Sequence, residues 1–268
     1  MIWLLSYLAL GLFAGFFAGM LGIGGGTVMT PLLVMLFAAQ AGFPAGEILH
    51  LALGTSMATI LFTSLSSLRE HHRHGAVLWP VVLTITPGIL CGTLAGTLLA
   101  ARVPAQPLAI FFAAFVCVVA LQMMLNLKPK PTRELPGKGG LFGVGAGIGA
   151  VSALVAIGGG ALTVPFLSWC NVRVHNAIGT SSAIGFPIAV GASLGYIFNG
   201  WGHAGLPPWS LGFVYLPALA CLAVASMLAA PFGAKTAHRL PVATLKRVFA
   251  VLLILLATKM VFDIFTAG

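Results

Sequence analysis

The sequence predicts an all-α integral membrane protein with about ten hydrophobic segments, some short, broken or re-entrant, in two inverted-topology repeats of five. Three observations lead to this prediction. The mean hydropathy is +1.08. Only 6% of the residues are charged, against about a quarter in ordinary soluble domains. The same short motifs also occur in the same order in both halves of the chain. With so few charges, the chain could not cover a water-facing surface.

Apolar runs give the expected segments in order, five on each side of a polar stretch. They lie near residues 2–21, 27–40, 47–68, 76–100 and 105–127, and then near 139–157, 161–170, 175–199, 209–232 and 242–264. The intervening stretch contains four basic residues and three prolines, which is typical of a linker. The expected organisation is a first five-segment repeat at 1–127, a cytoplasmic linker at 128–138 and a second five-segment repeat at 139–268.

Four motifs support a duplicated unit. They pair "IGGGTVMTPLL" with "IGGGALTVPFL", "HLALGTSMA" with "HNAIGTSSA", Gly75–Trp79 with Gly205–Trp209, and "ARVPAQPL" with "AHRLPVATL". Duplication of one unit is the simplest explanation for matches that keep their order. Each unit has five segments, an odd number, so if each segment crosses or pairs consistently, the second unit must lie inverted relative to the first.

Loop charges predict the orientation. In the inverted arrangement all but two of the 13 Lys and Arg residues fall on one side, the exceptions being Arg102 and Lys259. The positive-inside rule makes that side cytoplasmic. We therefore expect a multi-pass protein of the bacterial inner (plasma) membrane with both termini in the periplasm. The basic loops are expected to face lipid headgroups rather than nucleic acid.

The two glycine triplets predict breaks in membrane helices. Segment 27–40 would be only about 21 Å long as a helix, against a hydrocarbon core of about 30 Å, and segment 161–170 is shorter still. Irregular backbone at such depth is tolerated only where protein or a water-filled cavity surrounds it. Free N–H groups and the helix dipole at a fresh helix start favour an anion.

A substrate site is therefore expected where the two breaks meet near the middle of the membrane. Its expected residues are Gly24, Gly25, Gly26 and Thr27 in the first half, and Gly158, Gly159, Gly160 and Thr163 in the second. Pro31 and Pro165 mark the starts of the two short helices, because proline suits the first turns of a helix. Glycine also serves close helix packing, which is the expectation for Gly11, Gly15, Gly19 and for Gly88, Gly92, Gly96.

A second pair of motifs adds hydroxyls and histidines. The expected further binding residues are Thr55, Ser56, Thr180 and Ser181. His50 and His175 each precede a Gly-Thr-Ser by four residues and offer proton coupling near neutral pH. Two alternatives stay open: the histidines could simply cap helix ends, and the hydroxyls could bond back to carbonyls of their own helices. The remaining acidic or basic residues within segments, Glu47, Lys259 and Asp263, lie near segment ends.

Other classes of function are not favoured by the residues present. The cysteines show no C-x-x-C spacing, and "HHRH" lacks carboxylate or cysteine ligands, so we expect no metal site and no cofactor. The chain contains no P-loop, no H-E-x-x-H and no Ser/His/Asp set with a buried carboxylate, so we expect no enzyme. The expected partners are a small anion and membrane lipid, with no nucleic acid. Pairing as a homodimer is left open.

The duplicated I-G-G-G-x-x-x-x-P and G-T-S blocks resemble those of the sulfite exporter TauE/SafE family, also called TSUP or DUF81. The resemblance covers both halves, although the first motif ends "GTSM" and the second "GTSS". It implies a bacterial permease for sulfite, sulfoacetate and related sulfur-containing or organic anions.

The leading hypothesis is a secondary transporter that exports sulfite, a sulfonate or a related anion by alternating access. The alternatives are an anion channel and a proton-coupled uptake system for an organic anion.

Overall fold

The computed structural model describes residues 2–21, 25–125, 132–237 and 242–267. These residues form ten α-helices, a short 3₁₀ helix and a two-stranded hairpin. The elements are α1 (Ile2–Leu21), α2 (Gly26–Ala38), η1 (Ala45–Glu47), α3 (Ile48–Arg73), α4 (Trp79–Arg102), α5 (Ala105–Met124), α6 (Lys138–Val155), α7 (Gly160–Trp169), α8 (Val174–Asn199), β1 (Ser210–Leu211), β2 (Val214–Tyr215), α9 (Leu216–Ala237) and α10 (Val242–Ala267).

The helical character of the chain follows from its apolar runs, each of which contains one helix. In the described part of the chain, six helical stretches are long and apolar enough to cross a membrane: Ala45–Arg73, Trp79–Arg102, Ala105–Met124, Lys138–Val155, Val174–Asn199 and Leu216–Gly233. The chain is therefore an all-α, multi-pass membrane protein. Helices α2 and α7 have only 13 and 10 residues and are too short to cross alone.

One predicted segment begins later than expected. The apolar run from residue 209 does not continue as a helix, because residues 210–215 form the β1–β2 hairpin. Trp209 and Gly212 have positive φ angles of 68° and 55°, which end any helix or strand at those points. Helix α9 consequently starts at Leu216.

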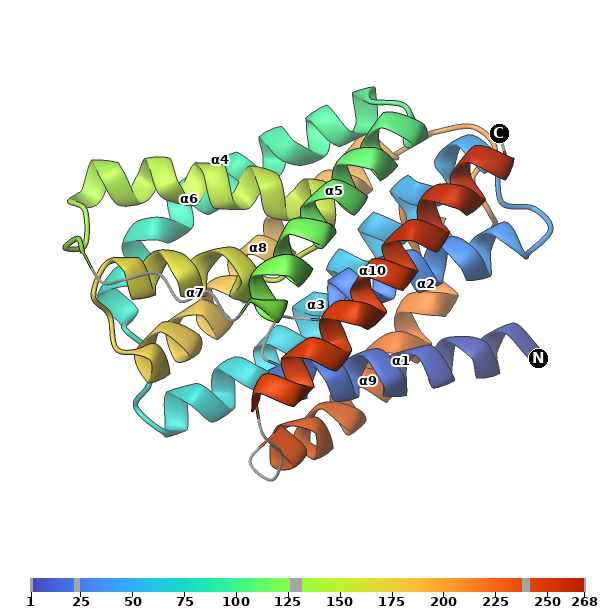
Figure 1. Ribbon diagram of the computed structural model, residues 1–268. Helices are drawn as coiled ribbons and strands as arrows, with labels where there is room; N and C mark the ends of the chain where they lie inside the picture. Colours follow the sequence, from blue (N-terminus) through green and yellow to red (C-terminus); the bar gives the residue numbers. More distant parts are fainter. Residues whose placement is uncertain (1, 22–24, 126–131, 238–241, 268) are drawn as a thin grey trace.

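Helix packing joins the two halves of the chain. Helix α1 packs along α9, α4 along α6, α3 along α8 and α5 along α10. In Figure 1 both termini lie at the same end of the bundle, whereas the α3–α4 and α7–α8 connections lie at the opposite end. Of the six long spans, α3 is the most buried, with 83% of its apolar window inside the protein.

Glycines produce two of these close contacts. Gly11 and Gly15 of α1 face the backbone of Leu222 and Ser226 on α9 so closely that a Cβ atom would overlap it. On α4, Gly88, Gly92 and Gly96 face the backbone of α6 in the same way. The prediction that these glycines serve helix packing is confirmed by their contacts. The surroundings of Gly19 lie outside the part that the structure describes.

Candidate functional site

The first helix break lies at the start of α2. Gly25 has a φ of 71°, and its carbonyl accepts the N–H groups of Val28 and Met29 at 3.1 and 3.0 Å. This left-handed conformation suits glycine because other residues would strain their Cβ atoms there. A Cβ atom on Gly26 would overlap the backbone carbonyl of Ala156. Gly24 lies outside the described residues.

The second break lies between α6 and α7. Ala156 ends α6 with a φ of 45°, and α7 begins at Gly160. A Cβ atom on Gly159 would lie 2.8 Å from the carbonyl oxygen of Ser181 on α8. Because Gly26 touches Ala156, the two breaks lie against each other, and the second also touches the Gly-Thr-Ser-Ser motif.

Both short helices begin with backbone groups that the helix itself does not satisfy. Within the described residues, no acceptor is found for the N–H groups of Ala161 and Leu162 in the first turn of α7. Pro31 and Pro165 lie inside α2 and α7. Each proline lacks an N–H, so the carbonyl four residues earlier, on Thr27 or Ala161, has no helical donor.

Three of the expected hydroxyl groups are buried and have no described partner. They belong to Thr27 and Thr163, which are fully buried, and to Ser181, which is 2% exposed. Burying a hydroxyl without a hydrogen bond is costly. Such groups in a native protein point to a partner outside the described residues, such as an ordered water or a ligand. By contrast, Ser56 accepts a hydrogen bond from Thr30 at 3.0 Å.

Thr55 and Thr180 connect the two halves of the chain. The hydroxyl of Thr55 accepts the N–H of Tyr215 at 3.0 Å, and the hydroxyl of Thr180 accepts the N–H of Leu78 at the same distance. The preceding glycines, Gly54 and Gly179, allow this approach, because a Cβ atom on either would collide with the backbone just before that N–H. Each Gly-Thr pair thus attaches its helix to the segment leading into α9 or α4.

The two histidines differ in environment. His50 is only 4% exposed, and its Nε2 lies 2.9 Å from the carbonyl oxygen of Ala100, in the last turn of α4. This contact is the one expected if His50 caps a helix end. His175, at the start of α8, is exposed.

Two residues that sequence reasoning did not assign to the site lie beside His50. Nδ1 of His50 is 3.1 Å from Oε2 of Glu47, and Nε2 of His203 is 3.2 Å from Oε1 of the same carboxylate. The ring of Phe213 lies against both imidazoles, with centroid distances of 5.3 and 5.7 Å. Glu47 belongs to η1 and lies three residues before His50, but His203 comes from the α8–α9 connection, so no local sequence signal brings the three residues together.

Ser152 and Ser193 also have buried hydroxyls without a described partner. They lie on α6 and α8, and neither belongs to a repeated motif, so no sequence signal identified them.

Polar groups at the two ends of the bundle complete the description. At the end of α3 that carries Arg69 and Arg73, a cavity of about 520 Å³ has these two residues and His72 on its wall.

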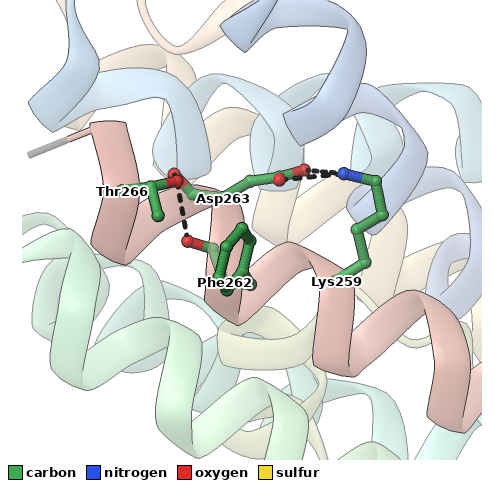
Figure 2. Close-up of polar contacts among 4 residues, drawn as sticks. All are labelled: Lys259, Phe262, Asp263 and Thr266. Carbon is green, nitrogen blue, oxygen red and sulfur yellow. Dashed lines mark hydrogen bonds and ion pairs between the residues drawn. The ribbon is translucent and has the colours of Figure 1, made fainter.

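On α10, Lys259 Nζ lies 2.9 and 3.1 Å from the two carboxylate oxygens of Asp263 (Figure 2). Asp263 is less exposed than Lys259, with side-chain exposures of 18% and 53%.

The fold and the site define a multi-pass membrane protein whose interior polar groups gather at two facing helix breaks, an arrangement suited to a membrane transporter. Residues 7–260 match the family model described as "Sulfite exporter TauE/SafE". The chain belongs to this family of membrane transporters.

The relatives carry names of the same kind. A "Probable membrane transporter protein" of Haemophilus influenzae is 36% identical over 96% of this chain and 97% of its own length. The "Probable membrane transporter protein YdhB" of Bacillus subtilis is 28% identical over 87% of this chain and 89% of its own. A further "Probable membrane transporter protein", MJ0441 of Methanocaldococcus jannaschii, is 24% identical over 84% and 83%. These names are those of transporters and not of enzymes.

Proposed function

We propose that this protein is a secondary transporter that exports sulfite, a sulfonate or a related small anion by alternating access. The observation that carries this proposal is the contact between the two helix breaks at Gly26 and Ala156, with the buried hydroxyls of Thr27, Thr163 and Ser181, which have no described partner, nearby in the fold. The family name adds the substrate class.

The chemistry of the site suits an oxyanion. Hydroxyl groups and the free N–H groups of Ala161 and Leu162 can donate to sulfonate or sulfite oxygens. The positive ends of the α2 and α7 dipoles favour negative charge. Hydrogen bonds to a charged partner contribute about 1.5–3 kcal/mol each. A few such bonds without a fixed cation would hold an anion and still allow its release.

Inverted repeats are part of the proposal, and the packing supports them. If α1–α5 correspond to α6–α10, the contact between α1 and α9 corresponds to that between α6 and α4. The bond from Tyr215 to Thr55 likewise corresponds to the bond from Leu78 to Thr180. The contacts α3–α8 and α5–α10 map onto themselves under the same exchange. We place the protein in the bacterial inner membrane with both termini outside and the linker inside.

The position of the basic residues and the membrane potential both favour export. In this orientation Arg69, Arg73 and His72 border a cavity at the cytoplasmic end of α3, where they would attract anions. Moving one negative charge outward across an inside-negative membrane is favourable by about 2.3 kcal/mol per 100 mV. Export of an anion therefore needs no coupled movement of protons. Proton-coupled uptake of an organic anion is a second candidate, because the buried His50 pairs with the partly exposed carboxylate of Glu47.

Reconstitution tests the proposal. Purified protein in liposomes would be tested for uptake of radiolabelled sulfite, short sulfonates and carboxylates at a set membrane potential, beside protein-free liposomes. We expect saturable, potential-dependent flux and counterflow for at least one sulfur-containing anion. Flux without saturation or counterflow would indicate a channel. Saturable flux restricted to carboxylates and driven by a proton gradient would support the second candidate.

A further inference from the structure

We propose that Glu47, His50 and His203 form a proton-binding site that holds one end of the transporter closed, and that this end faces outward. This inference rests on the proposed function, because it names the ion to which alternating access would respond. Nothing in the repeated sequence motifs identifies Glu47 or His203 as part of such a site.

The proton follows from the hydrogen-bond partners of His50. Its Nε2 lies 2.9 Å from the Ala100 carbonyl oxygen, which can only accept, so Nε2 must carry a hydrogen. The other nitrogen, Nδ1, is buried, lies 3.1 Å from Glu47 Oε2 and makes no aligned hydrogen bond to a described atom. If the carboxylate is ionised, favourable contact at this distance requires a proton on Nδ1 as well. If the carboxyl is neutral, it carries the proton itself.

One proton is therefore held between His50 and Glu47 in this conformation. Without it, a buried nitrogen lone pair would face a partly exposed carboxylate oxygen at 3.1 Å. That arrangement is repulsive, and the burial of His50 limits the solvent that could screen it. Loss of the proton should therefore separate the two side chains.

Three further elements bring polar or titratable groups toward this pair. The α8–α9 connection contributes His203, whose Nε2 lies 3.2 Å from Glu47 Oε1. The end of α4 contributes the Ala100 carbonyl and, at its last residue, the exposed Arg102. Hairpin strand β2 contributes Tyr215, whose ring packs instead against Tyr7. His203 is 45% exposed and gives the cluster contact with solvent.

The cluster lies at the place where the hairpin segment 200–215 covers the start of α3. Phe213 packs its ring on His50 and its backbone on Gly54, and Tyr215 donates to Thr55 one turn further on. Separation of Glu47 from His50 and His203 would release the first of these attachments. The proton thus favours the closed position of the hairpin segment.

Among the described residues, the opposite end of the bundle does not repeat this cluster at the matching position. The corresponding covering segment there attaches through Ala76 and Leu78 to Gly179 and Thr180. His175, at the position matching His50, is exposed, and the residue three positions before it is Val172 in place of a carboxylate. The Glu47–His50 pair therefore has no counterpart at the matching position of α8, and the histidines His71, His72 and His74 of that end belong to the end of α3.

Hydrogen–deuterium exchange of the full-length protein tests the site without any substrate. The amide groups of Phe213 and Tyr215 are hydrogen-bonded to Tyr196 and Thr55, so their protection reports closure of the hairpin segment. After correction for intrinsic exchange, we expect wild-type protection to fall from pH 6 to pH 8. The fall should approach tenfold per pH unit, the limit for release of one proton.

Variants at Glu47 sharpen the test. Glu47→Gln supplies a neutral N–H to Nδ1 and an oxygen to His203, so protection should stay high at both pH values. Glu47→Ala removes both contacts, so protection should be low at both. His74→Gln is the matched control, because His74 and Glu70 form an exposed pair at the other end, 3.6 Å apart, and this variant should behave as wild type.

Two outcomes would overturn the inference: wild-type protection that does not change with pH, or Glu47→Gln protection that falls as the wild type does. Neither result bears on anion flux, which the liposome assay measures separately. Conversely, a pH response without any anion flux would support the proton site and contradict the proposed transport function.

Discussion

Thr55 on α3 accepts a hydrogen bond from the backbone N–H of Tyr215, a residue 160 positions later in the chain, at 3.0 Å. The hydroxyl is fully buried, and the bond fixes the hairpin to the helix at the end where Glu47 and His50 also lie. Its counterpart, from Leu78 to Thr180, fixes the α3–α4 connection to α8. The Gly-Thr motif therefore holds together segments from different halves of the chain.

Replacing Thr55 by Val should lower stability. The N–H of Tyr215 would lose its acceptor, which costs about 1–3 kcal/mol when the group is buried. We expect a lower melting temperature in detergent, measured by intrinsic fluorescence, and recovery in Thr55→Ser. Thr59→Val is the control, because that buried hydroxyl bonds only the Thr55 carbonyl of its own helix, at 2.8 Å. Equal losses in Thr55→Val and Thr59→Val would contradict this account.

Replacing Gly26 by Ala should disrupt the contact between the two breaks. The added Cβ would overlap the Ala156 carbonyl, and a backbone atom cannot move aside as a flexible side chain can. Overpacking of this kind costs about 1–3 kcal/mol or more. The matched variant Gly143→Ala adds a Cβ on α6 where no atom lies within 4 Å, and should be neutral or stabilising by up to about 1 kcal/mol. Thermal unfolding of both proteins measures the difference, and a Gly26→Ala protein as stable as wild type would refute the close contact.

Thr163→Val separates binding from stability. Removing a buried hydroxyl that has no protein partner should leave the melting temperature unchanged or raise it. If the hydroxyl binds the anion, the loss of about 1.5–3 kcal/mol should weaken binding about 10- to 100-fold. Sulfite flux into liposomes measures this as a raised KM, with Thr59→Val as the control. A Thr163→Val protein with unchanged flux would exclude this hydroxyl from the site.

The ion pair on α10 predicts unequal effects of its two partners. Lys259→Met leaves the less exposed Asp263 without its cation near the end of an apolar helix. Asp263→Asn leaves a lysine whose longer side chain can reach water. We expect Lys259→Met to reduce the amount of folded protein in membranes more than Asp263→Asn does. Size-exclusion chromatography of detergent extracts measures both, and the reverse order would contradict the reasoning.

Reporter fusions test the orientation. A reporter that is active only in the cytoplasm should be active after Glu134 and inactive after Gly205, because the inverted arrangement puts these loops on opposite sides. Reporter activity after Gly205 would contradict the predicted topology.

Much of the fold could be predicted from the sequence because a membrane restricts the choices. Spans must be long, apolar and helical, so apolar runs indicate the helices and their order. The short segments 27–40 and 161–170 revealed the breaks because their lengths cannot cross a bilayer. The packing role of Gly88, Gly92 and Gly96 followed from their spacing of four residues, which places them on one helix face.

The partners of the polar residues could not be predicted in this way. Thr55 meets Tyr215, and Glu47 meets His203, only because α8, the hairpin segment and the start of α3 come together in space. No local pattern encodes contacts between residues more than 150 positions apart. The hairpin at residues 210–215 was missed because its apolar residues continue the run that becomes α9.

The glycine face of α1 has a consequence for synthesis of the protein. Gly15 fits against Ser226, which the ribosome adds about 210 residues later, or about 10–40 s later at about 5–20 residues per second. During that interval α1 lies in the bilayer without α9, and its glycine face contacts lipid or the insertion machinery. Assembly of this bundle is therefore completed only near the end of translation, and a chain cut short before α9 would present an unfilled groove to membrane quality control.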